Sequence, residues 1–197
     1  GAIRKIGKIL SPDPSTWEGE YIAANGSALL FRNSLHYWYQ GGRLAQIGLA
    51  IRAEGTQEWT RHGPPVLTPG PRGSWDERGV ADPYVVEYRD TLYLYYTGMD
   101  RAARQRLGVA RSSDGIHWEK SLDNPILEVG GLGEFDEGGL GEPAVWQSHG
   151  RYWMLYTGRA WDERRAIGLA ESPDGIQWQR SKAAPLLTGK PNTWMSH

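Results

Sequence analysis

Residues 81–98 read ADPYVVEYRDTLYLYYTG, and this stretch decides the fold because it recurs twice along the chain. It aligns without gaps on residues 141–158, GEPAVWQSHGRYWMLYTG, and on residues 24–41, ANGSALLFRNSLHYWYQG. The period is about 60 residues. Internal repetition of this kind indicates a repeat architecture, in which each unit is one supersecondary element.

Each unit predicts four β-strands. An apolar run such as residues 84–88 is followed by a polar turn and then by an aromatic run such as residues 92–97. A variable loop leads to a third, Gly-aliphatic-Ala run, found at 47–50, 107–110 and 167–170. The Asp-Gly pairs at 114–115 and 174–175 predict a tight hairpin into a fourth strand that carries a tryptophan. These tryptophans are Trp59, Trp118 and Trp178, and an apolar pair closes each unit.

The fold class that follows is all-β, a β-propeller of four-stranded antiparallel blades. The 26 glycines and 10 tryptophans fit turn-rich blades, and no segment keeps a helical periodicity for ten residues, which disfavours stacked α/β repeats. We assign blades to residues 11–69, 70–128 and 129–187, all within a single partial propeller domain. Residues 1–10 resemble the last strand of a preceding blade, and residues 188–197 resemble the start of a further one. Three blades alone predict an open arc, because propellers close with 4 to 8.

Composition excludes several classes of function. The 22 basic and 23 acidic side chains give a net charge of -1, which argues against a nucleic-acid or membrane partner. No apolar run approaches 18 residues, so no membrane-spanning helix is expected. Cysteine is absent, which removes disulfides and thiolate metal sites. With no visible signal peptide either, a cytoplasmic location is favoured.

Polar residues occupy one position of the repeat where chemistry can vary. The entry of the first strand in each unit carries Asn25, Asp82 or Glu142, and in a propeller this strand lies at the central axis. Two carboxylic acids in one pocket can work as a pair, one ionised and one protonated, as cleavage of a glycosidic bond requires. The alternative is that Asp82 and Glu142 cap their strands by accepting backbone N–H bonds. The recurring Asp76 and Asp136, by contrast, and the three repeated tryptophans are interpreted as scaffold.

At these residues the sequence resembles the five-bladed propeller glycosidases, the invertase and arabinanase group of glycoside hydrolase families 32, 43, 62 and 68. Residues 25–28 and 38–41 resemble the second invertase blade with its Ser-Gly-Ser-Ala motif. Ala81-Asp82-Pro83 resembles the Arg-Asp-Pro motif, and Glu142-Pro143 resembles the Glu-Cys motif. The chain would then be part of a five-bladed propeller.

The resemblance implies roles for individual residues. Glu142 would be the general acid, and Asp82 would stabilise the transition state and tune that acid. Asn25 and Ser27 would contact sugar hydroxyls. Three further residues lie in the loops between the second and third strands, around the mouth of the pocket: Asp100, Arg101 and Trp161. Trp161 could stack on a sugar ring or pack within its loop.

The departures from the family pattern concern catalysis and substrate. The nucleophile or base of that family is an Asp on a first blade, and nothing in this chain matches it. Ala81 replaces the Arg that helps to hold fructose. The sequence therefore predicts a carbohydrate-active propeller, incomplete as a catalyst, that acts on or binds furanoside or pyranoside glycans. The rival is a non-catalytic sugar-binding or assembly module.

We expect no cofactor and no metal, because no phosphate-binding glycine loop or metal-ligand spacing of histidines appears. A homo-oligomer could complete the propeller, since the two terminal blade faces should be apolar.

Overall fold

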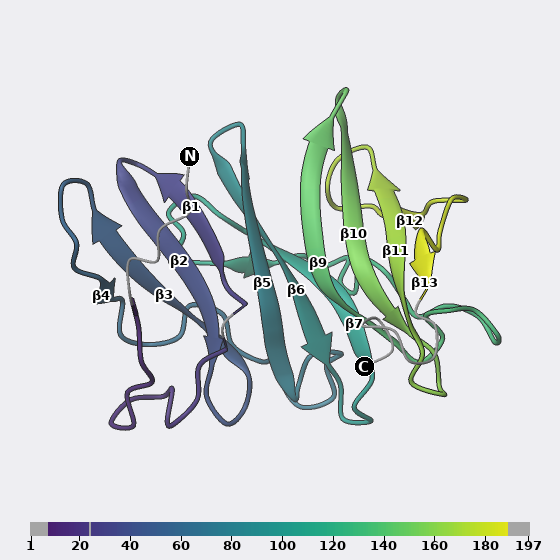
Figure 1. Cartoon of the computed structure of the whole chain (residues 1–197), viewed down its shortest axis with the longest axis horizontal. Coiled ribbons are helices and arrows are strands. Elements are labelled where there is room, and N and C mark those ends of the chain that lie inside the picture. Colours follow the sequence, from purple (N-terminus) through teal and green to yellow (C-terminus); the bar gives the residue numbers. More distant parts are fainter. Residues whose placement is uncertain (1–7, 24, 189–197) are drawn as a thin grey trace.

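Three antiparallel four-stranded sheets follow one another along the chain, as the repeat predicts (Figure 1). The structure is a computed structural model that describes residues 8–23 and 25–188. In these ranges the chain is all-β, and no helix is long and apolar enough to cross a membrane. Most of the strand expected in residues 1–10, and the blade start expected in 188–197 beyond residue 188, lie outside the described residues.

Each sheet is one blade, and its strands pair in chain order. Blade 1 consists of β1 (Ser27–Phe31), β2 (Ser34–Gly41), β3 (Gln46–Ala53) and β4 (Thr60–Arg61). Blade 2 consists of β5 (Gly79–Tyr88), β6 (Thr91–Met99), β7 (Gln105–Ser112) and β8 (Glu119–Lys120). Blade 3 consists of β9 (Gly139–Ser148), β10 (Arg151–Arg159), β11 (Arg165–Ser172) and β12 (Gln179–Arg180), with β13 (Leu187–Thr188) paired to β11. The fold class predicted from the sequence is confirmed.

The prediction of a tight hairpin into a fourth strand that carries the tryptophan is wrong. Residues 113–118 connect β7 to β8, and the tryptophan precedes the short strand instead of lying in it. Side chains hold this longer turn together: the Ser112 hydroxyl accepts the N–H of Gly115, and Asp114 Oδ1 accepts the N–H groups of Ile116 and His117. Polar side chains that satisfy these amides stabilise the wider turn.

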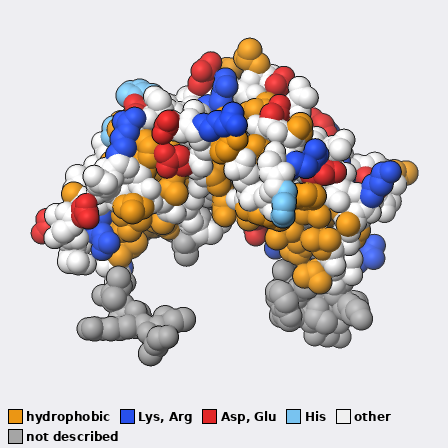
Figure 2. All heavy atoms as spheres, turned by 90° about the horizontal axis from the view of Figure 1, so that it is seen from above, with side chains coloured by type: hydrophobic (Ala, Val, Ile, Leu, Met, Phe, Trp, Pro, Cys, Tyr) orange, Lys and Arg blue, Asp and Glu red, His pale blue; other side chains and the backbone are white. Residues whose placement is uncertain are grey.

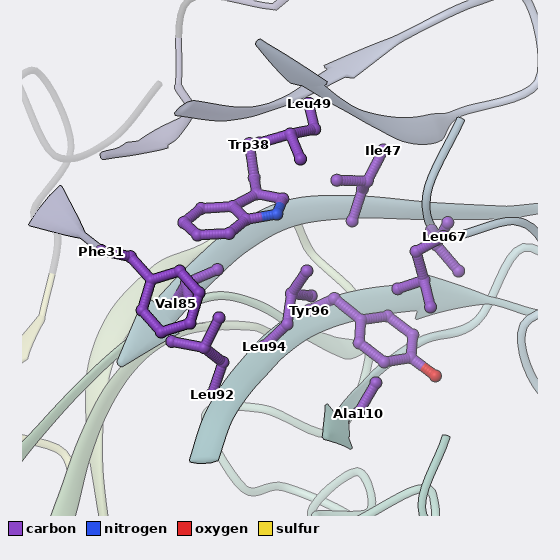
Figure 3. Close-up of a cluster of buried hydrophobic side chains, with 11 residues drawn as sticks. Phe31, Trp38, Ile47, Leu49, Leu67, Val85, Leu92, Leu94, Tyr96 and Ala110 are labelled. Carbon is purple, nitrogen blue, oxygen red and sulfur yellow. The ribbon is translucent and has the colours of Figure 1, made fainter. Parts of the chain in front are cut away.

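Apolar side chains fill the space between neighbouring blades. The cluster between blades 1 and 2 joins Trp38 and Leu49 of blade 1 to Leu92, Leu94 and Tyr96 of blade 2 (Figure 3). A second cluster joins blades 2 and 3. Two of the repeated tryptophans belong to these interfaces, because Trp118 packs edge-on against Trp38 and Trp178 packs edge-on against Tyr95. Trp59 packs edge-on against Tyr37 of its own blade. Their interpretation as scaffold agrees with these contacts.

A buried carboxylate at the opening of each unit ties its blade together. Asp136 Oδ2 accepts hydrogen bonds from the Tyr156 hydroxyl at 3.0 Å and from Arg180 Nε at 2.8 Å. The same arrangement recurs with Asp76, Tyr96 and Lys120 in blade 2 and with Glu18, Tyr39 and Arg61 in blade 1. All three carboxylates are buried, and a buried charge persists only when it is paired and hydrogen-bonded. The interpretation of Asp76 and Asp136 as structural agrees with these contacts.

The three blades curve into an arch when the molecule is viewed along its strands (Figure 2). Blade 1 occupies one end of the arch and blade 3 the other, with blade 2 between them. The described blades therefore form part of a ring, and hydrophobic side chains are visible at both ends.

Candidate functional site

The candidate site lies where the first strand of each blade begins. The starts of β1, β5 and β9 share one end of the molecule with the loops that join second and third strands, at the lower edge of Figure 1. This placement follows from the antiparallel order, because a second strand runs back toward the entry of the first. The first-strand entries and the loops between second and third strands therefore lie at the same end of the molecule, as the sequence predicts for the pocket.

Asp82 and Glu142 occupy the same irregularity in neighbouring blades. The register of β5 with β6 shifts between Ala81 and Tyr84, and β9 shifts against β10 at the equivalent place. Both acids adopt a left-handed backbone, with φ of 51° for Asp82 and 56° for Glu142. Such a conformation is strained for a residue other than glycine, and bulges of this kind re-aim a side chain near functional sites.

Side-chain contacts distinguish the two acids. Asp82 is partly buried, and its Oδ1 accepts a hydrogen bond of 2.7 Å from Asn25 Nδ2 of blade 1. Glu142 is exposed, and within residues 8–23 and 25–188 its carboxylate has neither a hydrogen bond nor an ion pair. Neither carboxylate accepts a backbone N–H bond among the described contacts, so the capping alternative does not describe this geometry.

The two acids line one pocket of about 200 Å³. Its wall includes Thr157 and the arginines Arg159 and Arg165 of blade 3. The guanidinium of Arg159 lies beside Gly139, where an added Cβ would be 3.6 Å from its Nη2. The pocket therefore combines two carboxylic acids with two cationic side chains, an arrangement that suits a polar or anionic ligand.

The structure gives the Ser27 hydroxyl a scaffold contact. It is buried between blades 1 and 2, where it accepts the backbone N–H of Val85 at 2.9 Å.

The loop residues around the pocket differ in what engages them. Asp100 Oδ1 accepts the N–H groups of Ala102 and Arg104 within its own loop, and Asp100 Oδ2 pairs with Arg106 at 3.2 Å. Arg101 and Trp161 are exposed on the β6–β7 and β10–β11 loops, and Trp161 is 69% exposed. None of these three lines the pocket of Asp82 and Glu142.

Sequence reasoning missed the residues that hold the two acids. The backbone N–H of Asp82 donates to Gln40 Oε1 at 3.2 Å, and that of Glu142 donates to Thr97 Oγ1 at 3.1 Å. Gln40 and Thr97 occupy the same place in the repeat, directly before a glycine of the second strand. A polar side chain in an otherwise apolar and aromatic strand is the signal that could have found them. Arg159 and Arg165 flank a loop of variable sequence and gave no such signal.

No group of three or more His, Asp or Glu side chains in the part of the chain that the structure describes could hold a metal ion.

The fold defines the protein as a β-propeller of four-stranded blades. Residues 54–195 match the model of the glycosyl hydrolases family 32 N-terminal domain. The chain belongs to this family. The resemblance drawn from the motifs of the sequence is confirmed.

Individual relatives extend this picture. The chain is 30% identical over 203 residues to the uncharacterized protein Rv1502 of Mycobacterium tuberculosis, covering 95% of this chain and 67% of that protein. It is 32% identical over 126 residues to a 1,2-β-oligomannan phosphorylase of Thermoanaerobacter, covering 59% of this chain and 41% of the enzyme. The fold matches Zg3597, a family 117 glycoside hydrolase of Zobellia galactanivorans, with a TM-score of 0.80 at 17% identity, over 95% of this chain and 63% of that one. The chain thus spans about two thirds of the length of Rv1502 and of Zg3597, and less than half of the phosphorylase.

Proposed function

We propose that this chain forms part of a glycan-cleaving pocket in which Glu142 is the general acid and Asp82 the supporting carboxylate. The observation that carries the proposal is that Asn25 of blade 1 bonds Asp82 of blade 2, and that Asp82 shares a pocket with Glu142 of blade 3, where the first strands of the blades begin. A general acid must reach the leaving oxygen, and the exposed Glu142 carboxylate is free among the described contacts. Asn25 orients Asp82, which supports the positive charge that develops on the sugar ring.

Cleavage by water needs a second carboxylate that acts as base or nucleophile. Asp82 is already bound by Asn25, and the family resemblance assigns the base to another blade. We therefore expect this chain by itself to bind sugars and to hydrolyse glycosides weakly or not at all, because one of the two bond-making steps lacks its agent. The alternative is a non-catalytic module that binds sugars or takes part in assembly and does not cleave glycosidic bonds.

The experiment is a screen of aryl furanosides and pyranosides with wild type and Glu142→Gln, combined with sugar titration by NMR. Sugar-dependent shifts of the Asn25, Asp82 and Glu142 signals are expected, in the millimolar range that corresponds to about −4.1 kcal/mol. Turnover abolished by Glu142→Gln would establish the acid. The absence of both turnover and shifts would contradict the proposal.

A second candidate function is phosphorolysis, and the specific observation in its favour is that Arg159 and Arg165 line the same pocket as Glu142. Arg159 also pairs with Glu163 at 3.8 Å, which leaves Arg165 as the principal cation for an anionic ligand. Phosphate is itself an anionic nucleophile, so the reaction needs an acid and a cationic site but no base. In that reaction Glu142 would protonate the leaving oxygen as the bond from the anomeric carbon to oxygen breaks. A phosphate oxygen would form the new bond to the same carbon. The relative that matches over 126 residues is described as a phosphorylase.

Phosphorus NMR distinguishes this candidate from hydrolysis. With phosphate and an oligomannan present, phosphorolysis predicts a sugar 1-phosphate signal and phosphate binding weakened about tenfold or more by Arg165→Gln. Arg164→Gln is the matched control, because Arg164 pairs with Asp162 and does not line the pocket of Glu142. Equal phosphate affinity in wild type and Arg165→Gln would contradict an anion site here.

A further inference from the structure

The backbone at the two acids requires support from outside their own blade. Asp82 and Glu142 hold positive φ at a register shift, where the ladder with the second strand of the same blade is interrupted. Their N–H groups are turned away from that ladder and need an acceptor elsewhere. The direction of each carboxylate depends on this local conformation, because the side chain leaves from the same Cα.

The preceding blade supplies the acceptor in both cases. Gln40 of β2 accepts the N–H of Asp82 in blade 2, and Thr97 of β6 accepts the N–H of Glu142 in blade 3. Thr97 is only 1% exposed, so its hydroxyl is held in place and shielded from water. Gln40 and Thr97, which share one position of the repeat, each accept the backbone N–H of the acid in the next blade.

Thr97 also lies next to the other acid. It pairs in the ladder with Ala81, the residue before Asp82. A Cβ placed on Gly141 would lie 3.4 Å from Thr97 Oγ1 and 3.9 Å from Asp82 Oδ2. Thr97 therefore sits where the start of blade 3 meets the acid of blade 2.

We propose that Thr97 and Gln40 are positioning residues, which aim Glu142 and Asp82 into the shared pocket through hydrogen bonds to their backbone N–H groups. The inference rests on the proposed function of these acids. Neither residue needs to touch the sugar: each fixes the left-handed turn from which a carboxylate projects. Thr157, the equivalent residue of blade 3, lines the same pocket.

The test compares Thr97→Val with Thr97→Ser in the full chain. Valine keeps the shape of threonine and removes the acceptor, whereas serine keeps the hydroxyl. The readouts are the carboxyl carbon and backbone amide NMR signals of Glu142, together with the exchange rate of that amide with solvent. Thr97→Val should move both signals and speed amide exchange about tenfold, in line with a lost internal hydrogen bond. Thr97→Ser should restore the wild-type values.

Two further variants keep the result decisive. Thr91→Val makes the same change at the far end of β6 and should leave the signals of Glu142 in place. Gln40→Met should move the signals of Asp82 and leave those of Glu142 unchanged, and it decides the matter where Thr97→Val fails to fold.

Unchanged Glu142 signals in folded Thr97→Val, or unchanged Asp82 signals in Gln40→Met, would overturn the proposal. These readouts need no ligand. A wild-type chain that shows no sugar-dependent shifts would refute the proposed function separately.

Discussion

Blades 2 and 3 have almost the same sequence pattern, yet their strands are buried differently. In blade 2, Leu107, Val109 and Tyr95 are fully buried because blade 3 covers them. The equivalent residues Ile167, Leu169 and Leu155 of blade 3 are only partly buried, on a face that no described blade covers. The closing leucine changes most, from 5% exposed at Leu127 to 56% at Leu187. Burial is therefore set by the neighbour of a blade, while the pattern of apolar residues is set by the repeat.

The largest expected difference between the two blades comes from a charge placed at equivalent positions. Val109→Asp puts an unpaired carboxylate between two blades and should cost about 4 kcal/mol or more in the free energy of unfolding. Leu169→Asp puts the same charge on the outer face of blade 3 and should cost about 1 kcal/mol. Urea denaturation followed by tryptophan fluorescence measures both.

Association of the chain through its outer faces would remove this difference, because Leu169 would then be covered as well. If the chain forms the proposed homo-oligomer, the decrease in the free energy of unfolding caused by Leu169→Asp should grow with protein concentration. Light scattering should then give a lower mass for this variant than for the wild type. If Val109→Asp and Leu169→Asp lower the free energy of unfolding equally at every protein concentration, the difference in burial between blades 2 and 3 is contradicted.

The buried carboxylates of blades 2 and 3 provide a second comparison, for which we expect a smaller difference in stability. The Tyr96 hydroxyl of blade 2 donates to Asp76 and accepts from Asn124 Nδ2, whereas the Tyr156 hydroxyl of blade 3 donates to Asp136 and has no asparagine beside it among the described contacts. Alanine replaces the asparagine in blade 3. Tyr96→Phe should therefore destabilise by about 2.5 kcal/mol and Tyr156→Phe by about 1.5 kcal/mol, because both variants lose a bond to a carboxylate and Tyr96→Phe also loses the neutral bond from Asn124.

Thermal unfolding of the two phenylalanine variants checks this order. Asn124→Ala in the wild type and in the Tyr96→Phe background is the control: its bonds to the Val109 backbone are lost in both, so the difference between the two losses of stability reports the bond to Tyr96 alone. A larger loss for Tyr156→Phe than for Tyr96→Phe would show that the additional amide contributes nothing.

The smallest expected difference between blades 2 and 3 concerns the pKa values of Asp114 and Asp174, in the turns before the fourth strands. Burial acts to raise the pKa of Asp114, but hydrogen bonds from the His117 ring and from backbone N–H groups outweigh it and hold the pKa well below its ordinary value. Burial also acts to raise the pKa of Asp174, and the backbone N–H groups of Gln177 and Ile176 outweigh it, so the pKa is lowered. Gln177 stands where blade 2 has His117. A lowered pKa in the folded state gives stability that is present above the unfolded pKa of about 3.9 and is lost as pH falls toward the folded value.

His117→Gln should make the turn of blade 2 titrate like that of blade 3. The carboxyl carbon signal of Asp114 should then titrate at higher pH than in wild type, while the signal of Asp174 stays unchanged. Titration of Asp114 at the wild-type pH in the variant would show that the backbone bonds alone lower its pKa.

The fold could be predicted from the sequence because a repeat is read by comparison within one chain. The alignment of residues 81–98 with residues 141–158 located strands, turns and the polar entry positions together. The recurring Asp76 and Asp136 were assigned to the scaffold because a functional residue need not appear in every blade. The width of the turn at residues 113–118 was not predicted, because the capping bonds of Ser112 and Asp114 outweighed the preference of Asp-Gly for a short hairpin.

The sequence by itself determined the blade, its repetition and the family of the chain, because local alternation and glycine spacing specify strands before any long-range contact forms. It also selected Asn25, Asp82 and Glu142 by their shared position. Only the tertiary structure decided which partners these residues have. Gln40, Thr97 and Asn25 reach an acid of the next blade across more than 40 residues of sequence, and no local pattern encodes such a contact. The strained turns of Asp82 and Glu142 persist because packing between blades supplies the acceptors that their own strands lack.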